Sequence, residues 1–282
     1  MPQPPTPMSD YVLTFNLSDF AELDRFALLA RQDYNLGNTT DWFGTFRGGL
    51  YGFYARIHGI EVNYHLVHSW IPRPRLPVET EYHVASVFFN MDSALECLTY
   101  ALNALGHAVM PTSFRDVTTR RDLAKISPRD VLGIPEGDPP RAPLPGYTNL
   151  FPSTQTHWLA NRDLIQTIFE LHDVSKHRQT IYAGGMARLD PPLGFYEALG
   201  VAGKRNEEAL FWPSAEIILR PDPKAPHAEQ ISRAREDYQT LEGLAQGFVQ
   251  FIDQTSRLAL ADARSTIALS HNQFMSAGET AP

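Results

Sequence analysis

The sequence predicts a mainly α protein with a four-helix-bundle-like core, long Pro/Gly-rich loops and a minor β element. Apolar residues recur at three- and four-residue spacing in four long segments, which is the pattern of amphipathic helices. The 22 prolines and 16 phenylalanines of the 282 residues indicate long, well-packed, irregular connections. One short apolar run, AEIILRPDPKAP at 215–226, predicts a strand closed by prolines.

The N-terminal region combines one clear helix with a mixed segment. Residues 1–10 predict a disordered tail, and a helix is expected from Ser18 or Asp19 to Asp33. The residue types at 35–40 favour a turn. The alternating run at 60–70, after Gly48 and Gly49, predicts a strand or hairpin, and the prolines of 71–77 predict an extended connector.

The clearest helix spans Val84 to Leu105, and Gly106 is expected to end it. Asp92 and Glu96 lie four residues apart on its flank, where a helix–helix hydrogen bond or a solvated edge is favoured over a metal site. Its buried stripe is predicted to contain Val84, Phe88, Met91, Leu95, Leu98, Leu102 and Leu105.

Two further long helices are expected, at 153–183 and at 227–269. The predicted organisation is a tail at 1–10, a segment at 11–77 that packs on the core, a helical domain at 78–270 and a flexible tail at 271–282. Loop insertions are expected at 107–152 and 184–226. The first insertion holds a basic segment, for which neutralisation of local acids is slightly favoured over phosphate or acidic-partner binding: Arg115, Arg120, Arg121, Lys125 and Arg129.

Composition narrows the classes of function. A net charge of −8 argues against a protein that coats nucleic acid, because such binding needs a large basic surface. The single cysteine, Cys97, excludes an intrachain disulfide and a cysteine metal cluster. The Pro-rich start does not resemble a signal peptide, and no apolar run is long enough to span a bilayer. A cytoplasmic location without membrane association is expected.

Residues 161–182 join helical periodicity to a dense set of ionisable groups. His172 is expected on or beside the buried face, seven residues after Ile165. Asp173 and His177 lie four residues apart, and an Asp beside a His can set the imidazole tautomer for acid–base chemistry. The cations that would suit a phosphate are Lys176 and Arg178. A second histidine group, His58, His65 and His68, has no carboxylate at a spacing that completes a metal site.

The long apolar helix, the variable insertion and the motif His172–His177 together resemble the HEPN superfamily of helical domains. That resemblance implies a homodimer of a prokaryotic defence or toxin–antitoxin type system, and a metal-independent ribonuclease that needs no cofactor. The family motif has an Arg, a polar residue and a His; Asp173 matches the polar position and His177 the terminal His, but His172 occupies the Arg position. In the implied mechanism His177 acts as acid or base, and Lys176 or Arg178 stabilises phosphate charge.

Two alternatives from other classes remain open. The adjacent His172 and Asp173 resemble the metal-binding pair of HD phosphohydrolases, with Asp262 as a downstream ligand and a divalent metal as cofactor. His157 precedes the pair too closely to match the usual first ligand. The other alternative is a non-catalytic helical module that binds a partner, since the sequence lacks a glycine-rich phosphate loop and other standard catalytic motifs. RNA or another phosphate-containing ligand is the expected partner of the nuclease.

Overall fold

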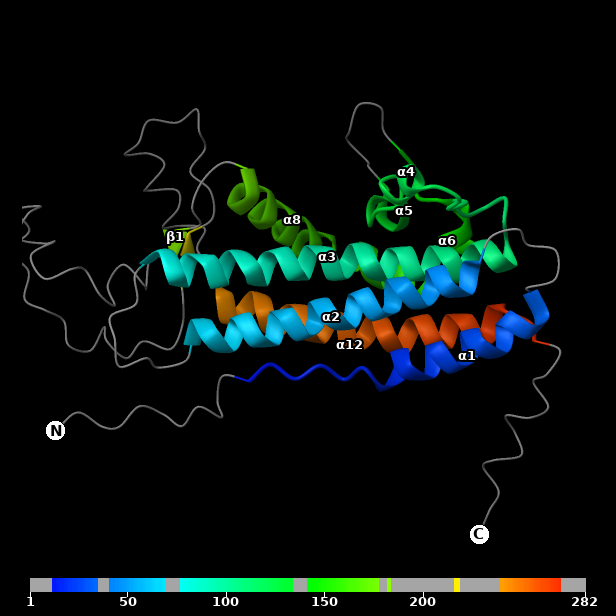
Figure 1. Cartoon of the computed structure of the whole chain (residues 1–282), viewed down its shortest axis with the longest axis horizontal. Helices are drawn as coiled ribbons and strands as arrows, with labels where there is room; N and C mark the ends of the chain where they lie inside the picture. Colours follow the sequence, from blue (N-terminus) through cyan, green and yellow to red (C-terminus); the bar gives the residue numbers. More distant parts are fainter. Residues whose placement is uncertain are drawn as a thin grey trace, which may run out of the picture. The chain divides into compact units, whose positions relative to one another are not determined.

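The computed structural model describes residues 12–34, 41–68, 77–133, 141–177, 182–183, 216–218 and 239–269. The predicted tails, the turn at 35–40 and most of the connector at 71–77 lie outside these residues. The described part of the chain is mainly α, as predicted (Figure 1). Its helices are α1 Ser18–Tyr34, α2 Trp42–His68, α3 Pro77–Val109, α4 Arg120–Leu123, α5 Arg129–Leu132, α6 Pro145–Leu150, α7 Pro152–Ala160, α8 Arg162–His177 and α12 Leu241–Thr266.

The chain divides into two compact units, and four of the described helices, α2, α3, α8 and α12, contribute residues to both. Unit 1 comprises Met1–Thr14, Ile57–Asp92 and Asp163–Val249, and unit 2 comprises Phe15–Arg56, Ser93–Arg162 and Gln250–Pro282. No helix in the described ranges is long and apolar enough to cross a membrane.

The first helix of unit 2, α1, forms as predicted. In Figure 1 it runs beside α2 and α12. Arg47 of α2 donates to Asp24 of α1 at 3.1 Å, and Arg264 of α12 lies 3.7 Å from Glu22. An apolar stripe of α1 is fully or almost fully buried: Phe20, Leu23, Phe26, Ala27 and Ala30.

Residues 60–68 belong to α2, so the predicted strand or hairpin is wrong. Ile57, Ile60 and Tyr64 are buried at three- and four-residue spacing, whereas Val62 is 40% exposed. A run this short fits both the two-residue period of a strand and the 3.6-residue period of a helix. It is helical here because it continues the helix that begins at Trp42. Asp41 starts α2 by accepting a hydrogen bond from the Gly44 backbone N–H at 3.0 Å.

Gly48 and Gly49 lie inside α2 and do not form a turn. A Cβ on Gly49 would stand 2.8 Å from the backbone nitrogen of Ala101 and 2.9 Å from the carbonyl oxygen of Cys97. Both atoms belong to the α3 backbone, so this glycine lets two helices of unit 2 approach closely. In unit 1, Gly59 plays the same part, with the side chain of Asn90 2.6 Å from the added Cβ.

The long central helix α3 confirms the strongest sequence prediction, because every residue of its predicted stripe is at most 1% exposed. Its predicted end at Gly106 is wrong, since α3 continues to Val109. Gly106 instead makes room for an aromatic ring: an added Cβ would lie 2.4 Å from Phe114. The glycine therefore serves packing rather than helix termination.

The single helix predicted at 153–183 is also wrong, because Asn161 separates α7 from α8. The Asn161 side chain donates to the carbonyl oxygen of His157 at 2.9 Å, which satisfies a group at the end of α7. The predicted insertion at 107–152 contains the short helices α4, α5 and α6.

A small antiparallel sheet in unit 1 confirms the minor β element. Its strands are β1 Tyr182–Ala183, β2 Glu216–Ile218 and β3 Gln239–Thr240, in the order β1-β2-β3. Tyr182 pairs with Ile218, and Glu216 pairs with Thr240. The last helix begins at Leu241, directly after β3, instead of at the predicted residue 227.

Candidate functional site

Helix α8 has one buried face, and His172 lies on it, as the spacing predicts. Ile165, Ile168 and Leu171 are at most 3% exposed, and His172 is 7% exposed. Asp163, Gln166 and Asp173 are exposed on the other side. A histidine on such a face must find a hydrogen-bond partner within the fold, because an unpaired polar group is costly to bury.

The partner of His172 is Asp92 of α3, and both residues belong to unit 1. The Nδ1–H of His172 donates a hydrogen bond to Oδ2 of Asp92. The side chains are 9% and 14% exposed, so this contact is shielded from solvent. Of the two alternatives expected for the carboxylates on the flank of α3, Asp92 makes the helix–helix hydrogen bond and is not part of a solvated edge.

The rest of the imidazole is enclosed. The ring of Phe89 meets it edge-on, with centroids 5.4 Å apart and planes at 73°. Nε2 of His172 is buried and has no hydrogen-bond partner in the described part of the chain. Because Asp92 receives Nδ1–H, a neutral His172 carries its lone pair on Nε2. The buried Nε2 does not offer a surface for a large substrate.

The other predicted site residues lie around the end of α8. Asp173 is exposed and follows His172 by one residue, so its side chain leaves the helix in a different direction. Positions 176 and 177 form the last residues of α8, but the side chains of Lys176 and His177 lie outside the described part of the structure. Arg178 lies outside the described residues altogether. The backbone places positions 173 and 177 one turn apart on the same helical face.

The downstream residue of the HD alternative, Asp262, has a structural partner in unit 2. It is 3% exposed, and its carboxylate accepts hydrogen bonds from the start of α7. The donors are the backbone N–H groups of Ser153 at 3.3 Å and Thr154 at 2.8 Å, with the Thr154 hydroxyl at 2.9 Å. These bonds satisfy amides that an α-helix leaves unpaired at its N-terminus.

Nothing in the described ranges brings three or more His, Cys, Asp or Glu side chains into a metal-binding group. His58 is exposed and lies 3.8 Å from Glu61, and His65 is half-buried on the same helix. The side chain of His68 lies outside the described part. The doubtful upstream ligand, His157, contacts the carbonyl oxygen of Phe251 through Nε2 at 3.1 Å.

The residue that sequence reasoning left out of the site is Asp92. It precedes His172 by 80 residues, and no motif links the two positions. In the sequence, Asp92 stands out only as a polar residue on the flank of an apolar helix. That position indicates a polar partner on a neighbouring element but does not identify which residue it is.

Comparison of the chain with protein-family models, curated proteins and solved structures finds no match.

Proposed function

We propose that this protein is a HEPN-like, metal-independent ribonuclease whose active residues lie on the last turns of α8. The observation that supports this is that α8 has a buried residue that anchors it and an exposed carboxylate near its end. His172 fixes the buried face to Asp92 of α3, while Asp173 is exposed and position 177 follows it by one turn. A His at position 177 would thus stand on an anchored helix beside a solvent-accessible carboxylate.

The chemistry would be attack of an RNA 2′-hydroxyl on the adjacent phosphate. His177 would remove the 2′-OH proton as general base, and a protonated acid would deliver a proton to the departing 5′-oxygen. The products are a 2′,3′-cyclic phosphate and a 5′-hydroxyl. Asp173 would set the tautomer of His177, and Lys176 or Arg178 would stabilise the charge that develops on the phosphate.

His172 is a positioning residue in this scheme. Its buried Nε2 and its contact with Asp92 keep it away from solvent. In the family motif, an arginine at this position would place a cation near the phosphate. Because His172 is buried here, Lys176 or Arg178 would supply that cation instead. We place the protein in the cytoplasm as a homodimer of a defence or toxin–antitoxin type system, because the family resemblance implies two copies of the motif.

A second function is favoured by one specific observation. The residue at the Arg position of the motif is a buried histidine that is hydrogen-bonded to Asp92, so it offers no free cation to a phosphate. A helical module that binds a partner without catalysis would need only the anchored helix and its exposed face. The metal-dependent HD alternative finds no support of this kind, because the carboxylate of Asp262 already caps α7.

The deciding experiment is cleavage of a mixed RNA by the purified full chain, with and without EDTA. His177→Ala should lower the rate about 10²–10⁴-fold, the usual contribution of a general acid or base. His58→Ala is the matched control, because His58 is an exposed histidine of α2 with 77% of its side chain accessible. Circular dichroism of each variant separates lost chemistry from lost folding.

The outcomes separate the three functions. Cleavage that persists in EDTA, yields cyclic phosphate ends and depends on His177 but not His58 supports the nuclease. Cleavage that EDTA abolishes and a divalent metal restores supports the HD alternative. The absence of cleavage under both conditions refutes the nuclease and leaves the binding module.

A further inference from the structure

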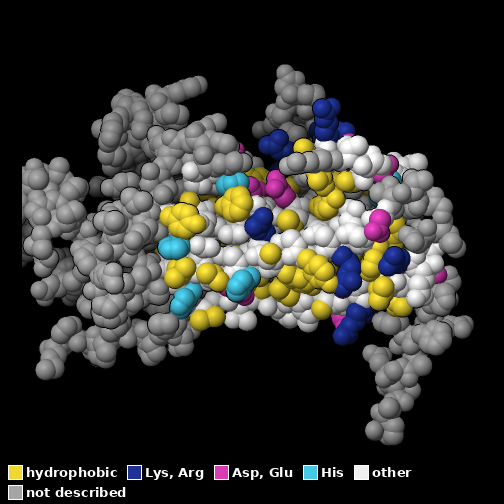
Figure 2. Space-filling view, in the orientation of Figure 1, with side chains coloured by type: hydrophobic (Ala, Val, Ile, Leu, Met, Phe, Trp, Pro, Cys, Tyr) yellow, Lys and Arg dark blue, Asp and Glu magenta, His cyan; other side chains and the backbone are white. Residues whose placement is uncertain are grey.

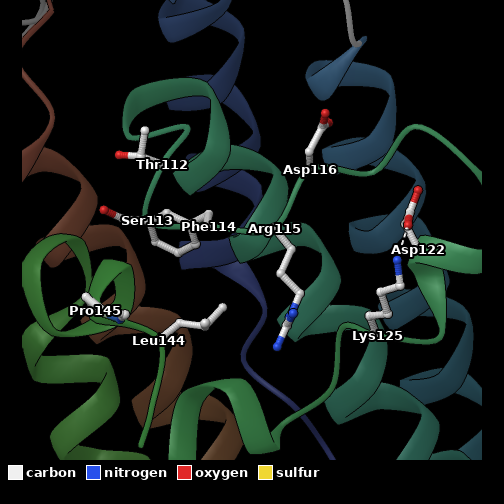
Figure 3. Close-up of a pocket in the computed structure, with 9 residues that line it drawn as sticks. All are labelled: Thr112, Ser113, Phe114, Arg115, Asp116, Asp122, Lys125, Leu144 and Pro145. Atoms are coloured by element: carbon white, nitrogen blue, oxygen red, sulfur yellow. Dashed lines mark hydrogen bonds and ion pairs between the residues drawn. The ribbon is translucent and has the colours of Figure 1, made fainter.

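A pocket of about 350 Å³ opens in unit 2, near the end of α3, and shares no residue with the α8 motif (Figure 3). Ligand pockets usually measure about 300–1,000 Å³, so this one suits a small molecule rather than a polymer. Its walls come from the turn after α3, from α4 and the turn after it, and from the start of α6: Thr112, Ser113, Phe114, Arg115, Asp116, Asp122, Lys125, Leu144 and Pro145.

Arg115 enters this pocket in a fixed orientation. Its Nε donates to Oδ2 of Asp130 at 3.0 Å and its Nη2 to Oδ1 at 2.8 Å. The Asp130 side chain is 0% exposed. Asn103 holds the backbone of Arg115 through two hydrogen bonds, at 2.8 and 3.0 Å. The guanidinium is therefore ordered before any ligand arrives, and its Nη1 has no acceptor in the described part of the chain.

The charge around Asp130 is not balanced. Arg141 also donates to Oδ1 of Asp130, at 3.1 Å, so two guanidinium groups share one buried carboxylate. The hydrogen bond to Asp130 raises the pKa of Arg115, which keeps this group charged. Asp130 by itself offsets only one of these two guanidinium charges, and an incoming anion would interact favourably with the other.

Of the two carboxylates that line the pocket, Asp122 is already paired with a cation. Asp122 accepts hydrogen bonds from the backbone N–H of Thr119 at 2.9 Å, from its hydroxyl at 2.8 Å and from Lys125 at 2.6 Å. Its acceptor capacity is thus largely used, while the ammonium group of Lys125 keeps two further protons to donate. Asp116 is directed away from the guanidinium of Arg115 (Figure 3).

We propose that this pocket binds the phosphate group of a small phosphorylated ligand, of about the size of a mononucleotide. The phosphate would contact Arg115 and Lys125, which both line the pocket (Figure 3). Leu144 and Pro145 provide an apolar wall for the rest of the ligand. A bidentate-held arginine with a lysine beside it is a suitable donor set for phosphate oxygens.

The surface around the pocket is consistent with anion attraction. Arg121 and Arg129 are exposed, and in the described residues neither forms an ion pair. Figure 2 shows lysine and arginine side chains over α4. These cations contrast with the net charge of −8 of the whole chain, and they would raise the rate at which an anion reaches the pocket.

The test is isothermal titration calorimetry of the full chain with inorganic phosphate, ribose 5-phosphate, AMP and adenosine. We expect binding of the phosphorylated compounds but not of adenosine, and a weaker affinity at higher salt. Lys125→Gln should weaken the binding of AMP about tenfold, the loss expected for one charged hydrogen bond. This variant should fold, because 61% of the lysine side chain is exposed.

Arg25→Gln serves as the control, since Arg25 is a 75% exposed cation of α1 and does not line the pocket. His177→Ala should leave the binding unchanged, so failure of the ribonuclease proposal would not affect this one. The inference is overturned if no phosphorylated compound binds at millimolar concentration. It is also overturned if adenosine binds as tightly as AMP, or if Lys125→Gln binds AMP with unchanged affinity.

Discussion

Two adjacent glycines of α2 should respond in opposite directions to the same substitution. Gly48 is exposed, and a Cβ added there meets nothing within 4 Å. Gly49 is buried, and its added Cβ would lie 2.8 and 2.9 Å from backbone atoms of α3. Ordinary contacts of a Cβ start near 3.4 Å, so α2 and α3 would have to separate by several tenths of an ångström.

The free energy of unfolding follows from these distances. Gly48→Ala should raise it by about 0.5–1 kcal/mol, because alanine restricts the unfolded chain and favours the helix. Gly49→Ala gains the same helical preference, but overpacking against backbone that cannot rotate away costs about 1–3 kcal/mol. The net effect at Gly49 should be destabilising. The free energy of unfolding should therefore be higher than that of the unchanged protein for Gly48→Ala and lower for Gly49→Ala.

Urea unfolding followed by circular dichroism measures both effects, and equal slopes with respect to urea would show that only stability has changed. The two variants control for each other, because they have the same composition and adjacent positions. If Gly48→Ala is destabilised as strongly as Gly49→Ala, the glycines occupy a turn and the helix is refuted. If neither changes the stability, the close approach of α2 and α3 is refuted.

Three further perturbations test contacts that lie within unit 1 or within unit 2. In a double-mutant cycle, Asp92→Asn and His172→Gln should show a coupling energy of about 1–3 kcal/mol, because this pair is shielded from water. The exposed pair His58 and Glu61 should show at most about 0.5 kcal/mol. Equal coupling energies for the two pairs would contradict the buried contact. Asp262→Ala should lower the free energy of unfolding by about 1–3 kcal/mol through loss of the α7 cap. The metal content of the Asp262→Ala variant, measured by mass spectrometry, should match that of the unchanged protein. Loss of a bound divalent metal in this variant would favour the HD alternative. Burial lowers the pKa of His157 from 6.5, so its neutral form is favoured in the folded state. The stability that depends on this group should be complete above about pH 6.5 and should be lost as the pH falls through the lower folded pKa. The difference in unfolding free energy between the protein and His157→Gln, measured across this range, should therefore shrink on acidification, and a constant difference would refute the assignment.

The sequence alone determined the strongly periodic parts of the fold. The stripe of α3 holds its spacing from Val84 to Leu105 without interruption, and only a helix buries all of those side chains on one side. The same reasoning placed α1 and set His172 on the buried face of α8. These predictions depend on local periodicity, which each segment carries by itself.

Tertiary structure decided everything that depends on a distant partner. The alternation at 60–68 fits a strand equally well, and Gly48 and Gly49 look like a turn until α3 is placed against them. Gly106 looks like a helix end until Phe114 fills the space beside it. In the candidate site, His172 finds Asp92 through a contact between two helices, and two residues 80 positions apart share no pattern that one sequence can reveal. Periodicity shows which face of an element is buried, whereas the partner on that face is set only when the whole chain packs.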